Sequence, residues 1–234
     1  MAVVAVLVLA GTVAFGQGNT CAYTFTFPKH SFQFCLTGDG TLALLQSPLG
    51  VNHLDTANPI EGWSWQVMGT VPGGGDVFFD GQQVPAYGGS TLGTPTVTQP
   101  NGPGTLPIRF DWHGFPADMW ETVSAQPAQR LVVLRVGIPA KGVWWGGSLT
   151  RLITLRLDGT TENKFRHLRV GAFAYVDGGE ALVLQSPAPV CFGPGEIFDR
   201  VQCAATPFNG YGTLIAEGEY TPHTPTLVVT YQIF

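Results

Sequence analysis

The stretch Thr226-Leu-Val-Val-Thr-Tyr-Gln-Ile233 places a large apolar side chain at every second position. A β-strand points successive side chains to opposite faces, so this period of two predicts a strand with one face in a core and one in water. No window of the chain shows the spacing of a convincing amphipathic helix. The same alternation recurs upstream at residues 23–27, 32–36, 132–138, 153–158 and 168–176.

Short glycine turns separate these segments and point to the fold class. Residues 37–40, 158–159 and 177–179 combine Gly with Asp, which is typical of tight turns because glycine adopts positive φ without steric cost. Regular strands without intervening helices favour antiparallel sheets. The sequence therefore predicts an all-β fold, an antiparallel β-sandwich of the jelly-roll or immunoglobulin-like kind, with few or no helices.

The composition supports a folded protein rich in turns. The chain has 234 residues, of which 44% are hydrophobic and only 12% are charged. That hydrophobic content is enough to form a core, and so few charges argue against intrinsic disorder. Glycine and proline contribute 31 and 18 residues, and without a collagen repeat this abundance is typical of many short strands joined by turns.

The net charge of −5 and the scarcity of lysine exclude two classes of partner. A nucleic-acid binder needs a basic face to displace counterions from phosphates, and an anionic membrane attracts clustered Lys and Arg. The densest basic run, residues 164–169, has instead the pattern of the solvent side of a strand. We therefore expect neither nucleic acid nor an anionic membrane surface as a main partner.

The N-terminal segment has the features of an export signal. Residues 2–15 are apolar or small and carry no charge, and the run is shorter than the roughly 20 residues that cross a bilayer. Ala14 and Gly16 supply small residues where a signal peptidase cuts. We expect a signal peptide at residues 1–16, a single β-sandwich domain at residues 17–234 beginning at Gln17, and a secreted, extracellular or periplasmic protein with no later transmembrane segment.

The cysteines fit that oxidising compartment. Their spacing favours two local disulfides, Cys21–Cys35 and Cys191–Cys203, and closing such a short loop stabilises a fold by about 3 kcal/mol. The rival pairing cross-links both N-terminal cysteines to the C-terminal pair. Neither pair has the close spacing of a structural zinc site, so we expect no metal and no cofactor.

Residues 81–108 contain no charged side chain and are dense in Gly, Pro and Thr. We interpret this stretch as a long loop on one continuous sandwich, with an interdomain linker as the alternative. The segment Thr94-Pro-Thr-Val-Thr98 within it has the composition of an edge strand, where proline is tolerated.

One part of the chain resembles a known group of proteins. Phe32-Gln-Phe-Cys-Leu-Thr-Gly-Asp-Gly-Thr-Leu42 is followed by Ser47-Pro-Leu-Gly50 and Glu61-Gly-Trp63. These residues are similar to the opening of uncharacterised secreted bacterial β-rich proteins, which begin with F-x-F-C, a glycine turn and S-P-x-G. The resemblance implies secretion and a β-rich fold, and it implies no particular activity.

The sequence contains none of the motifs that mark common catalytic sites. It has no G-x-S-x-G elbow, no P-loop and no H-E-x-x-H, and its five histidines are widely spaced. Asp111-Trp112-His113, followed by Asp118 and Glu121, is interpreted as a strand end and turn, with a catalytic or calcium-binding loop as the alternative. Glycoside hydrolysis needs two carboxyl groups that flank the scissile bond, and the candidates by local environment are Glu61, Asp111, Asp118 and Glu121.

Tryptophans are the remaining candidates for a binding site. Trp63, Trp65, Trp144 and Trp145 could stack against sugar rings if they are exposed. Our first hypothesis is a secreted non-enzymatic β-sandwich with a structural, surface or adhesion role, whose partner is a glycan or another surface protein. The alternative is a glycan-binding module that uses these four tryptophans. A second alternative is an extracellular hydrolase whose site is not readable from sequence.

Overall fold

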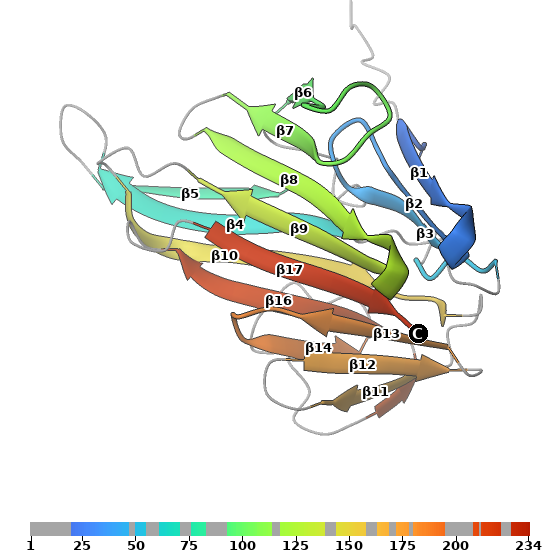
Figure 1. The fold of residues 1–234 in the computed structure, drawn as a ribbon. Coiled ribbons are helices and arrows are strands. Elements are labelled where there is room, and N and C mark those ends of the chain that lie inside the picture. The colour runs from blue at the N-terminus through green and yellow to red at the C-terminus, as the bar shows by residue number, and fades with distance from the viewer. Residues whose placement is uncertain are drawn as a thin grey trace, which may run out of the picture.

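The computed structural model describes residues 20–46, 50–54, 61–70, 76–82, 93–113, 118–138, 144–157, 163–168, 172–177, 180–194, 208–210, 212–220 and 226–234. These residues form three antiparallel sheets, within which short 3-10 turns connect some neighbouring strands (Figure 1). The strands are β1 (Tyr23–Phe27), β2 (Phe32–Leu36), β3 (Leu42–Gln46), β4 (Glu61–Thr70), β5 (Asp76–Gln82), β6 (Thr96–Thr98), β7 (Ile108–Trp112), β8 (Met119–Gln126), β9 (Leu131–Gly137), β10 (Trp144–Thr154), β11 (Asn163–His167), β12 (Ala172–Asp177), β13 (Glu180–Gln185), β14 (Val190–Pro194), β15 (Phe208–Gly210), β16 (Gly212–Tyr220) and β17 (Thr226–Ile233).

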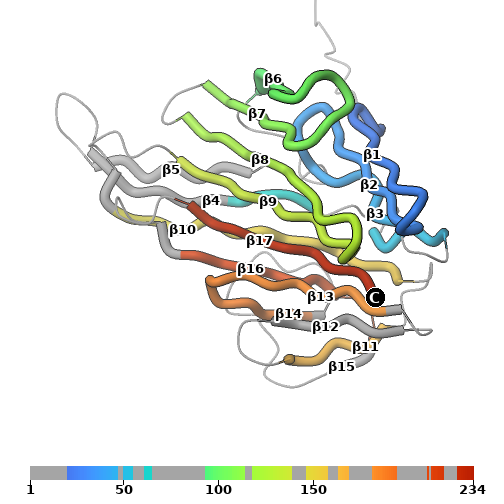
Figure 2. The backbone as a smooth tube through the Cα atoms, in the orientation of Figure 1, coloured from blue at the N-terminus to red at the C-terminus, as the bar shows by residue number. Residues whose placement is uncertain are grey.

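The largest sheet has nine strands in the order β15-β11-β12-β13-β17-β9-β8-β7-β6. The alternating segment at residues 226–233 is β17, which pairs with β9 on one side and β13 on the other (Figure 2). Its apolar positions are buried and the intervening positions are partly or fully exposed. The strand predicted from the period of two is therefore confirmed.

A five-stranded sheet, β14-β16-β10-β4-β5, lies behind the nine-stranded sheet in Figure 1. Inward side chains of both sheets form one hydrophobic cluster, in which Leu149 and Ile153 of β10 join Val123 of β8, Leu134 of β9 and Val229 of β17. The predicted antiparallel β-sandwich is confirmed. Its core is the apolar layer between these two sheets.

The third sheet, β1-β2-β3, packs its aromatic side chains on one end of the sandwich. Phe25 and Phe34 lie 5.1 Å apart between ring centroids, and Tyr23 meets Phe110 of β7 edge-on at 5.8 Å. Leu54, which follows β3, forms a β-bridge with Leu155 just after β10. The small sheet is therefore attached to both layers of the sandwich.

The first predicted disulfide, Cys21–Cys35, is present and its two Cα atoms lie 5.5 Å apart. It ties the segment before β1 to β2. Cys191 of β14 is also disulfide-bonded. Its predicted partner Cys203 lies outside the described residues, so the Cys191–Cys203 pairing stays a prediction.

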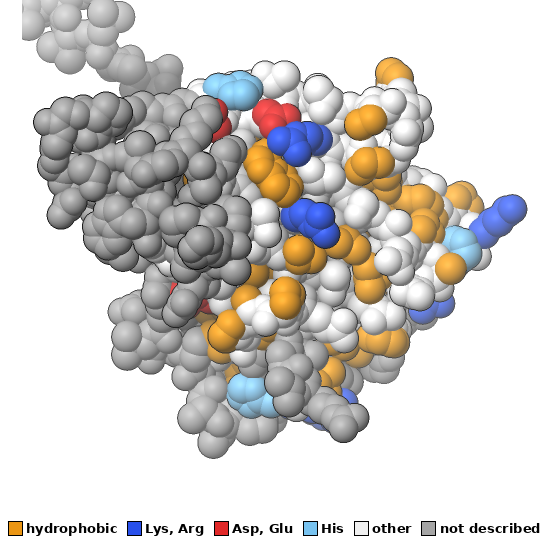
Figure 3. Space-filling model, turned by 60° about the vertical axis from the view of Figure 1, so that its left-hand side comes forward, with side chains coloured by type: hydrophobic (Ala, Val, Ile, Leu, Met, Phe, Trp, Pro, Cys, Tyr) orange, Lys and Arg blue, Asp and Glu red, His pale blue; other side chains and the backbone are white. Residues whose placement is uncertain are grey.

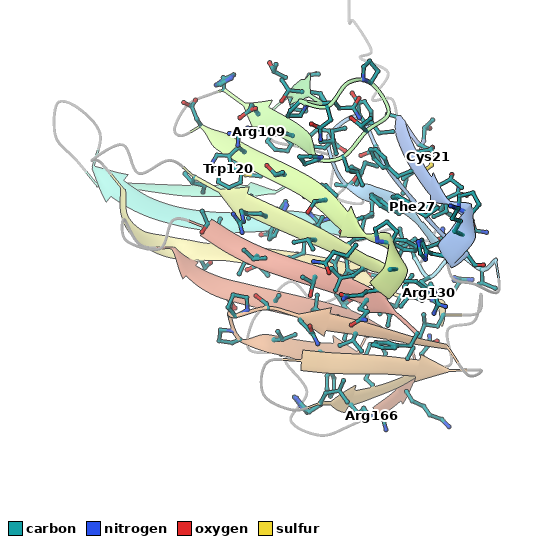
Figure 4. The ribbon with its side chains drawn as sticks, in the orientation of Figure 1. Cys21, Phe27, Arg109, Trp120, Arg130 and Arg166 are labelled. Atoms are coloured by element: carbon teal, nitrogen blue, oxygen red, sulfur yellow. A yellow bond between two sulfur atoms is a disulfide. The ribbon has the colours of Figure 1, made fainter. Side chains whose placement is uncertain are left out.

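Two hairpins use the same proline turn and meet each other. Pro28 begins the 3-10 turn between β1 and β2, and Pro127 begins the one between β8 and β9. Each turn ends in a residue with positive φ, Ser31 or Arg130, whose N–H bonds back to the proline carbonyl. Arg130 Nε also donates to the carbonyl of His30 at 3.2 Å. Figure 4 shows Arg130 beside the small sheet that carries Phe27.

The uncharged stretch at residues 81–108 is structured at both ends. Strand β5 extends to Gln82, and Thr96–Thr98 forms β6, which pairs with β7 at the edge of the nine-stranded sheet. The edge strand expected in this stretch is therefore confirmed, while residues 83–92 lie outside the described residues. The predicted signal peptide at residues 1–16 also lies outside them. Among the described residues, no helix is long and apolar enough to cross a bilayer.

We predict that deletion of Thr226–Phe234 abolishes the soluble monomer. The deletion leaves the hydrogen-bonding edges of β9 and β13 unpaired and removes the buried side chains of β17 from the core. Burial of each such large side chain contributes about 1.5–3 kcal/mol to stability. Size-exclusion chromatography and circular dichroism measure the result. Phe234→Ser is the matched control, since that side chain is 54% exposed. A folded monomer after the deletion would contradict the prediction.

Candidate functional site

A buried arginine lies at the centre of the sandwich. Arg151 occupies an inward position of β10 between Leu149 and Ile153, where the strand alternation calls for an apolar residue. Its side chain is fully buried. Removing a guanidinium from water is costly unless charged and hydrogen-bonding groups surround it, so the partners of Arg151 decide whether this position is tolerable.

The partners of Arg151 come from both sheets. Its Nη2 donates to Glu61 Oε1 on β4, in the same sheet. From the opposite sheet, Glu121 Oε1 on β8 accepts from Nη1, and the Tyr231 hydroxyl on β17 accepts from Nε, each at 3.2 Å. All three partners sit at inward strand positions. The network therefore joins the two layers through hydrogen bonds across the core.

The third sheet joins the network through its backbone. The Leu42 N–H, at the start of β3, donates to Glu61 Oε2 at 2.5 Å. Gly40 in the preceding turn has a φ of +87°, and a Cβ built there would lie 2.8 Å from Glu121 Oε2. The turn can approach the buried carboxylate this closely because glycine has no side chain and tolerates that φ.

Trp63 completes the surroundings of the arginine. The guanidinium carbon lies 4.8 Å from the centroid of the Trp63 ring, which is the geometry of a cation–π contact. Trp63 pairs directly opposite Arg151 in the β4–β10 ladder and is fully buried. The ring therefore covers the charge on the side of β4.

The pKa values of Glu61, Tyr231 and Arg151 are all raised in this buried network. Burial raises the pKa of the Glu61 carboxyl, although Arg151 and the Leu42 N–H oppose this shift. Burial also raises the pKa of the Tyr231 hydroxyl, which is therefore neutral. Burial disfavours charge on Arg151, but Glu61, Tyr231 and Glu121 outweigh that effect and raise its pKa. Arg151 is therefore a permanent cation.

This network has the groups of an acid–base site but not its accessibility. The side chains of Arg151, Glu61 and Glu121 are at most 2% exposed. A glycosidase needs its two carboxyl groups beside the substrate, and a substrate cannot reach these. Two of the four candidate acids, Glu61 and Glu121, therefore bind the sheets together.

The other two candidate acids lie at the surface. Asp111 forms an ion pair with Arg109 at 2.7 Å, and Asp118 lies 3.6 Å from His113 Nδ1. The His113 side chain is 69% exposed. Within the described residues, no group of three or more His, Cys, Asp or Glu side chains is arranged to hold a metal ion.

The structure places the four candidate tryptophans in two adjacent strands. Trp63 and Trp65 belong to β4, and Trp144 and Trp145 to β10. Trp63 is sealed in the core by its contact with Arg151, so it is not available to a ligand. The side chains of Trp65, Trp144 and Trp145 lie outside the described residues, and their role in glycan binding stays a prediction.

A different tryptophan lies on the solvent face of the nine-stranded sheet. Trp120 of β8 is half-buried, and the guanidinium carbon of Arg109 lies 4.8 Å from its ring centroid. Arg109 is held in turn by Asp111 on the same strand, through Nε and Nη2. Figure 4 shows Arg109 and Trp120 side by side at one end of the sheet. Arg109 and Trp120 were not among the residues predicted to form a site. The available signal was the alternation of Arg109 and Asp111 with the apolar Phe110.

The fold has a counterpart among solved structures. No protein-family model and no curated protein matches the sequence. The chain is similar to a bacterial glucoamylase whose crystal structure was determined in complex with acarbose, with a TM-score of 0.60 and 8% sequence identity. The similarity covers 92% of this chain and 32% of that chain. The chain therefore spans about a third of the glucoamylase with which it shares a fold.

A second buried titratable group, His53, links the small sheet to β10. Its backbone N–H donates to the Leu45 carbonyl at 2.8 Å, and its carbonyl accepts from the Arg156 N–H at 2.9 Å. The imidazole is fully buried. Burial lowers the pKa of His53 to about 4, so the ring is neutral at pH 7.

We predict that Arg151→Met destabilises the protein by about 3–5 kcal/mol, because it leaves buried carboxyl groups without their cation. The free energy of unfolding in urea measures this loss. Arg166→Met, at an exposed position of β11, is the matched control and should change stability by less than about 0.5 kcal/mol.

A second variant tests the physical reason for that loss. Combining Arg151→Met with Glu61→Leu and Glu121→Leu removes all three charges together. This variant should be more stable than Arg151→Met alone, because no unpaired charge remains in the core. Equal stability of the single Arg151 variant and the wild type would show that the network does not hold the sheets together.

We predict that acid weakens the fold through His53. The folded protein binds the His53 proton near pH 4 and the unfolded chain near pH 6.5, so this contribution is fully present above pH 6.5 and is lost as the pH falls to 4. The loss amounts to about 3 kcal/mol. NMR titration of the imidazole should give a midpoint near 4, and a midpoint near 6.5 would contradict the prediction.

Unfolding experiments check the same effect independently. The His53→Gln variant should lose stability less steeply than wild type between pH 6.5 and 4, whereas His113→Gln should follow wild type because His113 is exposed. The comparison isolates His53 from Glu61, whose raised pKa favours the folded state in acid.

Proposed function

We propose that this protein is a secreted, non-enzymatic β-sandwich with a structural, surface or adhesion role. The observation that carries this proposal is the position of Glu61, Glu121 and Arg151. The groups best suited to acid–base chemistry are sealed in the core, where they hold three sheets together. Because these buried charged groups pair with one another across the sheets, they stabilise the fold, as is expected of a structural protein.

Secretion is part of the same proposal. The apolar segment at residues 2–15 is typical of an export signal. The Cys21–Cys35 disulfide is compatible with an oxidising compartment. A low charged fraction, a large buried core and a cross-linked N-terminal sheet together suit a protein that stays folded outside the cell.

Glycan binding is the second candidate function, and two observations favour it. The glucoamylase of similar fold was crystallised with acarbose, a ligand of that protein. In this chain, Trp120 lies on an exposed sheet face beside charged side chains, which is a common setting for contacts with sugars. The first and second proposals are compatible, because adhesion can use a glycan.

We predict that the purified mature protein releases no reducing ends from starch, cellulose or pectin. The expectation follows from the burial of Glu61 and Glu121. A reducing-sugar assay with long incubation measures the result. Activity that survives Glu61→Gln but disappears in Asp111→Asn or Asp118→Asn would overturn the non-enzymatic proposal and favour a hydrolase with a surface site.

A further inference from the structure

The outer face of the nine-stranded sheet carries a group of side chains that the core does not use. We call it the Trp120 face and define it as Arg109, Asp111, Trp120, Arg135 and Gly137. Cross-strand pairing places Asp111, Trp120 and Gly137 in one row, and Arg109, Thr122 and Arg135 in the next. Both rows lie on the side opposite the inward residues Phe110, Glu121 and Val136.

The indole of Trp120 lies against the backbone of Gly137. A Cβ built on Gly137 would come within 2.6–2.9 Å of three ring atoms, Cζ2, Cε2 and Nε1. Only a residue without a side chain allows this approach. Glycine costs stability inside a strand, and here it leaves the space that the Trp120 ring occupies.

Arg109 is oriented over that ring with donors to spare. Asp111 holds its Nε at 2.9–3.0 Å and its Nη2 at 2.7 Å. Its Nη1 makes no hydrogen bond to the described residues, and the side chain is 39% exposed. The guanidinium is therefore fixed by Trp120 and Asp111 while still able to donate outward.

Arg135 adds a cation whose charge is not neutralised on this face. Its side chain is exposed, and it forms no ion pair with a described acidic residue. Arg135 on β9 and Arg109 on β7 both pair with Thr122 of β8, so one strand lies between the two arginines. Along this face Asp111 balances Arg109, and Asp118 lies beside His113 in the adjoining row. Arg135 is therefore the cation of this face that has no described acidic partner.

We propose that the Trp120 face binds an acidic polysaccharide, one whose sugar rings carry carboxylates. This inference rests on the proposed surface role. A carboxylate pairs with Arg135 and with the free Nη1 of Arg109, while a sugar ring packs on the Trp120–Arg109 stack. In the space-filling view, basic, acidic and hydrophobic side chains adjoin on one face (Figure 3).

Affinity gel electrophoresis and titration calorimetry with polygalacturonate test the proposal, with soluble starch as the neutral comparison. Wild type should bind polygalacturonate, and the affinity should fall as salt increases. Arg135→Gln should weaken binding about tenfold by removing one charged contact. Arg166→Gln, another exposed arginine of the same sheet, is the matched control and should bind like wild type. Figure 4 shows Arg166 at the opposite end of that sheet from Trp120.

Trp120→Ala should also weaken binding, and its thermal melt shows whether the fold is retained. Because Arg135 makes no internal ion pair with a described residue, the Arg135→Gln variant decides the matter even if Trp120→Ala unfolds. Absence of binding, equal binding of starch, or equal loss with Arg135→Gln and Arg166→Gln would each overturn this inference. Those results leave the non-enzymatic role standing, whereas cleavage of polygalacturonate would overturn the proposed function itself.

Discussion

The need to neutralise one buried guanidinium constrains the whole sandwich. Arg151 is paired with groups 90, 30 and 80 residues away in the sequence, on Glu61, Glu121 and Tyr231. An apolar interface tolerates small sliding movements, but these hydrogen bonds require one alignment of β4, β8, β10 and β17. The Leu42 N–H extends the same requirement to the small sheet. Hydrophobic burial drives the two sheets together, and the hydrogen bonds of the network fix how one sheet is aligned over the other.

This use of charge also shapes what the surface can do. Glu61, Glu121 and Arg151 are removed from contact with solvent, in a chain where only 12% of residues are charged. Of the arginines outside the core, Arg109 is paired locally with Asp111, whereas Arg135 and Arg166 are exposed. Such a surface suits recognition through stacking and a few oriented charges better than chemistry at a solvated acid pair.

Much of the fold could be predicted from the sequence because strand alternation is a local signal. Residues 226–233 predicted a half-buried strand, and Thr94–Thr98 allowed an edge strand, which lies at Thr96–Thr98. The buried network escaped prediction because its members are far apart in the chain. The available signal was a charged residue in the apolar phase of a strand, as for Glu121 between Met119 and Val123. Alternation alone cannot show that several such residues meet.

The likeness to the glucoamylase sharpens this distinction between fold and function. At 8% identity the two chains share an architecture, which shows that two very different sequences can form the same fold. A shared fold therefore carries little information about activity. Features that the fold does not require are more informative, and Gly137 is one of them, because an ordinary strand gains stability from a side chain at that position. The missing side chain at Gly137 leaves room for the Trp120 ring. The function is therefore best sought on the outer face of the nine-stranded sheet.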